Sequence, residues 1–149
     1  MWAKLNGALA GSILPIIFCL VYDIPRGIFG LNPFSLVYLI GIYVACYVYV
    51  KTEKRGPTAK GCGETAALMA VVNGLFLSVI ALFSVIHSVD ALFKVLYSYV
   101  PLLIIFGVLV VAAVCFLIGY MFGKLFFGKD IEKSWKGDMC GKEEREDEW

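Results

Sequence analysis

Four long stretches without a charged residue restrict the possible folds of this chain more than any other feature. They cover residues 5–22, 34–50, 65–86 and 101–122, and none contains Asp, Glu, Lys or Arg. Each has about the 17–25 residues that a helix needs to cross a bilayer. Backbone polar groups find no water inside lipid, so each stretch is expected to pair its own groups as a helix. The sequence therefore predicts an all-α membrane protein, a bundle of about four transmembrane helices.

The composition also favours a membrane location. Hydrophobic residues make up 60% of the chain, whereas soluble domains have about 45–50%. The charged residues, 17% of the total, gather mainly at 51–60 and after residue 123. This apolar excess is too large for one small water-soluble core. We therefore expect an integral protein of a plasma or equivalent inner membrane.

Residues 1–137 are expected to form one transmembrane domain. Within it, the apolar spacing of residues 88–100 predicts a short interfacial helix before a bend near Pro101. A second interfacial piece is expected around Trp135. Residues 138–149 carry six acidic side chains and show no apolar periodicity, which predicts an acidic, disordered cytoplasmic tail.

The distribution of basic residues predicts the orientation. Lys4, the 51–60 stretch and the region after residue 122 are basic, whereas the two other connections hold only Arg26 and Lys94. By the positive-inside rule, both termini and the 51–64 connection are cytoplasmic. That connection is expected to be a flexible turn. Its basic side chains are predicted to contact anionic membrane lipids, and they are Lys51, Lys54, Arg55 and Lys60.

Small residues recur at four-residue intervals inside the apolar stretches. Small side chains let helix backbones approach closely in lipid. The glycines predicted to pack helices are Gly7, Gly11, Gly41, Gly74, Gly119 and Gly123. Packing within the bundle is the favoured interpretation, and an interface with another subunit is the alternative. The glycine pairs at 7 and 11 and at 119 and 123 have the same expected depth, so the first and fourth helices are expected to meet there.

Two polar residues, Asn73 and Tyr43, are predicted to be buried within the apolar stretches. An amide in lipid seeks a hydrogen-bond partner on another helix. The hydroxyl of Tyr43 has two candidate partners, Asn73 and the carbonyl that Pro15 leaves free. Interhelical hydrogen bonding is the favoured role for Asn73, with a polar path through the membrane as the alternative.

No residue pattern predicts catalysis. The four stretches lack the ionisable residues that mark proton and ion pathways. The five cysteines show no C-x-x-C spacing and His87 is the only histidine, so no metal, cofactor or catalytic site is expected. A net charge of +1 gives no reason to expect a nucleic-acid partner. The favoured function is a non-catalytic accessory or structural subunit that self-associates or joins a larger membrane complex. The alternative is a homo-oligomeric channel or facilitator for a small or neutral solute.

Overall fold

The computed structural model describes residues 1–21, 33–53, 56–85, 89–96 and 98–135. These residues form helices and contain no strand, which confirms the all-α prediction for the described part of the chain. The helices are α1 (Trp2–Val21), α2 (Pro33–Thr52), α3 (Ala59–Val85), α4 (Val89–Leu96) and α5 (Val100–Leu125). A further helical stretch covers 128–135. The predicted tail at 138–149 lies outside the described residues.

Two of these helices are long and apolar enough to cross a membrane. The candidate spans are Ala59–Ile80 in α3 and Val100–Leu125 in α5. In α1 and α2 the described apolar stretches are shorter, covering Trp2–Phe18 and Leu36–Thr52. By length and composition, α3 and α5 therefore point to a membrane location.

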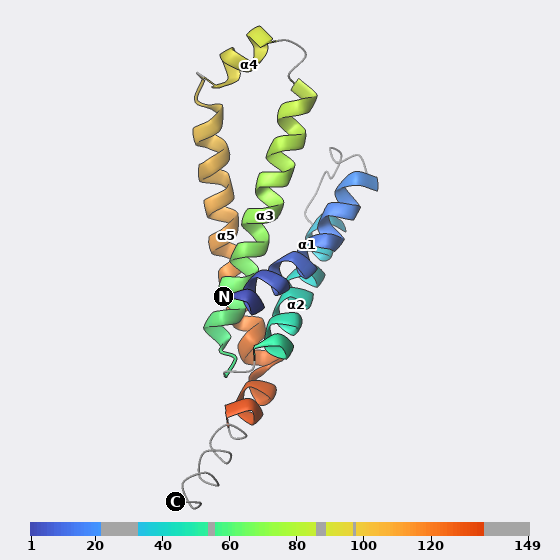
Figure 1. Cartoon of the computed structure of the whole chain (residues 1–149), viewed down its shortest axis with the longest axis vertical. Coiled ribbons are helices and arrows are strands. Elements are labelled where there is room, and N and C mark those ends of the chain that lie inside the picture. The colour runs from blue at the N-terminus through green and yellow to red at the C-terminus, as the bar shows by residue number, and fades with distance from the viewer. Residues whose placement is uncertain (22–32, 54–55, 86–88, 97, 136–149) are drawn as a thin grey trace, which may run out of the picture.

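The helices form two antiparallel pairs of unequal height (Figure 1). The long helices α3 and α5 stand side by side, and α4 lies across one end of this pair. The shorter helices α1 and α2 pack on each other and against the part of the long pair that is remote from α4. As a result, the ends of α3 and α5 nearest α4 rise beyond α1 and α2.

Helix α3 begins six residues before the predicted span, and the expectation of a flexible turn up to residue 64 is wrong. The side-chain oxygen of Thr58 accepts the backbone N–H of Gly61 at 3.0 Å, which caps the new helix. The glycines that suggested a loop are sites of close approach. A Cβ on Gly61 would collide with the Tyr49 hydroxyl, and one on Gly63 would lie 2.9 Å from the Phe116 carbonyl oxygen.

The predicted short helix at 88–100 is shorter in the structure, where α4 covers Val89–Leu96 and α5 begins at Val100. Between them, the Ser98 hydroxyl donates to the Val95 carbonyl at 2.6 Å and accepts the Val100 N–H at 3.3 Å. These bonds satisfy backbone groups at the end of one helix and the start of the next. Pro101, which has no N–H, occupies the first turn of α5, where none is needed.

The first pair of predicted packing glycines lies between α1 and α2. A Cβ on Gly11 would lie 2.5 Å from the Gly41 carbonyl oxygen, and one on Gly41 would lie 2.7 Å from the Gly11 oxygen. One turn away, a Cβ on Gly7 would lie 2.6 Å from the Ala45 oxygen. The two backbones therefore touch at a crossing that leaves no room for side chains.

The remaining packing glycines lie between α3 and α5. A Cβ on Gly119 would lie 2.6 Å from Ala66 Cβ, and one on Gly123 would lie 2.9 Å from Ala59 Cα. On α3 itself, a Cβ on Gly74 would lie 2.7 Å from a methyl group of Val108. The expectation that α1 and α5 meet through their glycines is therefore wrong, because each glycine pair packs on a different neighbour.

Candidate functional site

An apolar cleft between α2, α3 and α5 is the best-formed candidate site in the described structure. Its volume is about 670 Å³, within the roughly 300–1,000 Å³ of small-molecule sites. It lies where α3 and α5 begin to rise past α2. Its lining residues are Tyr38, Leu39, Ile42, Ala70, Gly74, Leu77, Ser78, Leu103, Ile104, Gly107, Val108, Val111, Val114, Cys115 and Ile118.

The chemistry of this cleft suits an apolar molecule. Its lining includes two hydroxyl-bearing side chains, Tyr38 and Ser78, and no charged residue. The Ser78 hydroxyl donates to the carbonyl of Gly74 at 2.7 Å, so its proton is already used within α3. The cleft therefore offers an occupant dispersion contacts and apolar burial, and almost no hydrogen bonding.

Two glycines shape the cleft in different ways. Gly74 lets Val108 pack directly against α3, so the two long helices are held together there. A Cβ on Gly107 would meet no atom within 4 Å. Gly107 therefore contributes free space to the cleft wall and no helix contact.

Among the described residues, the buried amide of Asn73 finds no partner for the interhelical hydrogen bond that the sequence predicts. Its side chain is 1% exposed, and neither Nδ2 nor Oδ1 has a hydrogen-bond partner among the described residues. Asn73 follows Thr65 and Met69 at four-residue intervals on α3. Those two residues lie at the glycines of α1, Gly7 and Gly11. Helix periodicity therefore places Asn73 next along the α3 face that packs on α1.

The prediction that Tyr43 is buried is wrong. Its side chain is 42% exposed. Its ring packs against Phe127 with the ring centres 5.3 Å apart, and more loosely against Phe122 and Phe126. Tyr47 extends this aromatic cluster, with its ring centre 6.4 Å from that of Phe127. This patch between α2 and the end of α5 was missed in the sequence because its members are distant in the chain.

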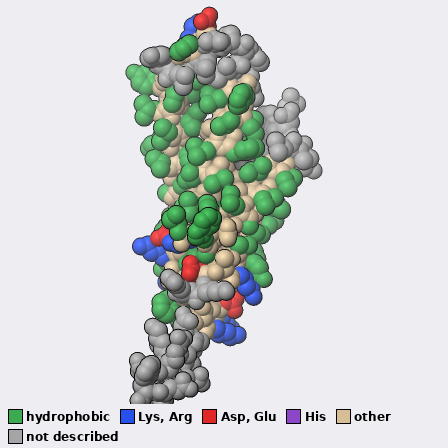
Figure 2. Space-filling model, in the orientation of Figure 1, with side chains coloured by type: hydrophobic (Ala, Val, Ile, Leu, Met, Phe, Trp, Pro, Cys, Tyr) green, Lys and Arg blue, Asp and Glu red, His purple; other side chains and the backbone are tan. Residues whose placement is uncertain are grey.

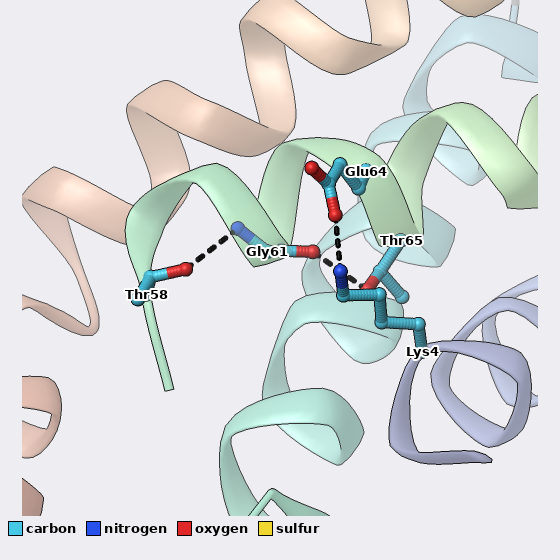
Figure 3. Close-up of polar contacts among 5 residues, drawn as sticks. All are labelled: Lys4, Thr58, Gly61, Glu64 and Thr65. Carbon is cyan, nitrogen blue, oxygen red and sulfur yellow. Dashed lines mark hydrogen bonds and ion pairs between the residues drawn. The ribbon is translucent and has the colours of Figure 1, made fainter. Parts of the chain in front are cut away.

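A polar contact joins the beginnings of α1 and α3 (Figure 3). The Lys4 ammonium donates to the Glu64 carboxylate, and each side chain is about one third exposed. This hydrogen bond raises the pKa of Lys4. Thr65 is fully buried beside the pair and donates its hydroxyl proton to the Gly61 carbonyl at 2.7 Å. Glu64, which no sequence pattern indicates as a contact residue, thus ties α3 to α1.

Charged side chains gather at the ends of the molecule, with hydrophobic side chains over the helices between them (Figure 2). Of the predicted lipid-contacting residues, Lys51 and Lys60 are exposed, and Lys54 and Arg55 lie outside the described residues. The Lys51 ammonium lies 5.8 Å from the centre of the Tyr47 ring. Cations above aromatic rings are suited to a membrane interface.

The helical stretch 128–135 is anchored to the start of α3. The indole N–H of Trp135 donates to the Pro57 carbonyl at 3.2 Å. Its ring lies against Gly56, where φ is +84°, a conformation that glycine adopts without strain. The end of the described chain is thus fixed to the segment between α2 and α3.

The described residues contain no group of three or more His, Cys, Asp or Glu side chains placed to hold a metal ion. Cys46 and Cys62 are fully buried free thiols at the contacts of α2, α3 and α5.

The apolar cleft is therefore the candidate site with the best-formed geometry in the described part of the chain. No family model, curated protein or solved structure matches this chain.

Proposed function

We propose that this protein is a non-catalytic accessory subunit of a membrane assembly, built as a four-span bundle with both termini in the cytoplasm. The observation that carries the proposal is the unpartnered surface of α5. Its buried residues are all small and lie on one face, and they are Ala112, Cys115, Gly119 and Gly123. The large apolar side chains around the rest of the helix touch lipid or another protein.

The exposed part of α5 is long and continuous. Its large side chains with more than half of their area exposed include Leu102, Ile105, Phe106, Leu109, Leu117 and Met121. A monomeric soluble protein rarely exposes so large an apolar patch, and such patches mark membrane or protein contacts. Because α5 contacts its own bundle through one narrow stripe of small residues, the broad remaining face of the helix is free to contact a partner.

The lengths of α1 and α2 support four spans. Their charge-free parts, residues 5–21 and 33–50, have 17 and 18 residues. These lengths reach the lower limit of the roughly 17–25 residues that a helix needs to cross a bilayer. The Lys4–Glu64 contact places the start of α1 beside the start of α3, which supports an arrangement with both helix starts on one side of the membrane.

Purification from the native membrane in mild detergent tests the proposed function. We expect the protein to elute with a partner or as an oligomer, well above its own mass of 16.5 kDa. Replacing Phe106 and Leu109 on α5 with Ala should shift it toward the monomer. The matched change of Leu9 and Ile13 on α1, which are also exposed, should have a smaller effect. A monomer from native membranes would contradict the proposal, and solute flux through a purified homo-oligomer in liposomes would favour a channel.

Cysteine labelling tests the orientation. Cys62 is fully buried, so its failure to react would not report the side of the membrane. Cysteines introduced at the exposed positions Lys60 and Lys94 are suitable reporters. We expect a membrane-impermeant maleimide added to intact cells to label Lys94→Cys and not Lys60→Cys, with the unmodified chain as background. Labelling of Lys60→Cys before permeabilisation would overturn the orientation.

A further inference from the structure

We propose that the cleft between α2, α3 and α5 binds one acyl chain of a membrane phospholipid, which enters from the end near α4. This lipid-binding site is separate from the proposed subunit role, because that role depends on the outer face of α5. The ends of α3 and α5 nearest α4 rise beyond α1 and α2 (Figure 1), and the lining of the cleft extends toward these ends as far as Ser78 and Leu103. In a bilayer, the medium that meets such an opening is hydrocarbon.

The size of the cleft favours a lipid acyl chain over a protein helix as its occupant. A helix with side chains is about 10 Å wide. Over the length of α5 from Leu103 to Ile118, about 22 Å, it would fill roughly 1,700 Å³ as a cylinder. The cleft offers about 670 Å³. A helix of a second copy or of another protein is therefore too large for the cleft to enclose, whereas a single hydrocarbon chain is thin enough to enter it.

The depth of the cleft matches one leaflet. Its α3 wall, residues 70–78, is about 12 Å long, and its α5 wall, residues 103–118, is about 22 Å long, at 1.5 Å per residue. The chains of one leaflet occupy about 15 Å, half of the hydrocarbon thickness. The two walls therefore enclose about the length of one chain from near the headgroups to the bilayer centre.

The direction of entry follows from the positions of the lining residues. Leu77 and Leu103 lie toward the α4 end, and Ala70 and Ile118 lie at the deep end. Lys94 is exposed on α4, beyond the shallow end. Its charge complements a lipid phosphate. A lipid with its headgroup near α4 thus places its acyl chain against the apolar walls of the cleft and its phosphate near Lys94.

Photocrosslinking of the full-length protein in phosphatidylcholine liposomes tests the site. Two probes would be used, phosphatidylcholines with a diazirine near the carbonyl end or near the methyl end of one chain. We expect the first probe to label Leu77 and Leu103, and the second to label Val114 and Ile118. Labelling of these residues should exceed that of the outward-facing Leu109 and Leu117, as read by mass spectrometry of peptides.

The variant Gly107→Leu separates a bound chain from lipid that merely surrounds the protein. Gly107 lines the cleft, and a Cβ at this position would meet no atom within 4 Å, so the fold should be retained, as thermal unfolding would verify. We expect labelling inside the cleft to fall about tenfold, equivalent to about 1.4 kcal/mol of binding free energy. Ala113→Leu is the matched control, because Ala113 is exposed on α5 and does not line the cleft.

Equal labelling of the cleft and the outer face would overturn this proposal, as would a reversed depth order or cleft labelling unaffected by Gly107→Leu. Absence of cleft labelling would also overturn it. The subunit role is judged separately by the purified assembly. A lipid-filled cleft in a monomer would support the site and reject the subunit role, and an oligomer with an unlabelled cleft would do the reverse.

Discussion

Replacing Gly11 with Ile is expected to cause the largest loss of stability of any change proposed for this protein. The new Cβ alone would lie 2.5 Å from the Gly41 carbonyl oxygen and 2.7 Å from Ala45 Cβ. The first of these neighbours is backbone, so α1 and α2 must separate to admit the side chain. Forced overpacking costs about 1–3 kcal/mol, and we expect a value near the upper limit. Chemical or thermal unfolding in detergent would measure it.

The control for this change is Gly107→Ile, which adds the same side chain to a glycine without a neighbour. Its stability should equal or slightly exceed that of the unmodified chain, because glycine is a poor helix former by about 0.8–1 kcal/mol relative to Ala. Equal stability of Gly11→Ile and Gly107→Ile would contradict the close crossing of α1 and α2.

Replacing Asn73 with Leu is expected to stabilise the protein. The two side chains have the same number of heavy atoms and similar branching, so the change removes the amide and largely retains the shape. A buried polar group without a partner costs about 1–3 kcal/mol, and Asn73 has no hydrogen-bond partner among the described residues. We expect a gain of about that size, measured as the free energy of unfolding in detergent.

Asn73→Ala provides the comparison, because it also removes the amide and leaves an unfilled space. It should be less stable than Asn73→Leu, since cavities in a packed interior are costly. If Asn73→Leu were instead less stable than the unmodified chain, the amide would have a partner that the described residues do not supply, such as a bound water molecule.

The helices could be predicted from the sequence because helix formation in lipid depends on each segment alone. A long segment without charge must pair its own backbone polar groups inside the bilayer, whichever helices pack against it. The start of α3 was predicted wrongly for the opposite reason. Gly61 and Gly63 resemble loop residues in the sequence. Only the neighbouring Tyr49 and Phe116 show that they are helix-packing glycines.

The partners of the packing residues could not be predicted either. The four-residue spacing of Gly7 and Gly11 indicates close approach, but it does not name the opposing helix. Depth alone suggested α5, whereas the structure pairs these glycines with Gly41 and Ala45 of α2. The cleft was missed for a similar reason. It arises from the unequal heights of two helix pairs, and residues such as Leu103 are ordinary apolar residues in the sequence.

The unequal helix lengths have a consequence for the surrounding membrane. The charge-free parts of α3 and α5, residues 65–85 and 100–123, are about 31 and 36 Å long, whereas those of α1 and α2, residues 5–21 and 33–50, are about 26 and 27 Å. In the proposed orientation, one flank of the protein is thus shorter than an average bilayer and the other is longer. Hydrophobic mismatch is relieved by helix tilt or by local thickening of the bilayer, at a modest cost for each ångström. The protein would thus favour the boundary between a thinner and a thicker region of the membrane, with its longer flank toward the thicker side.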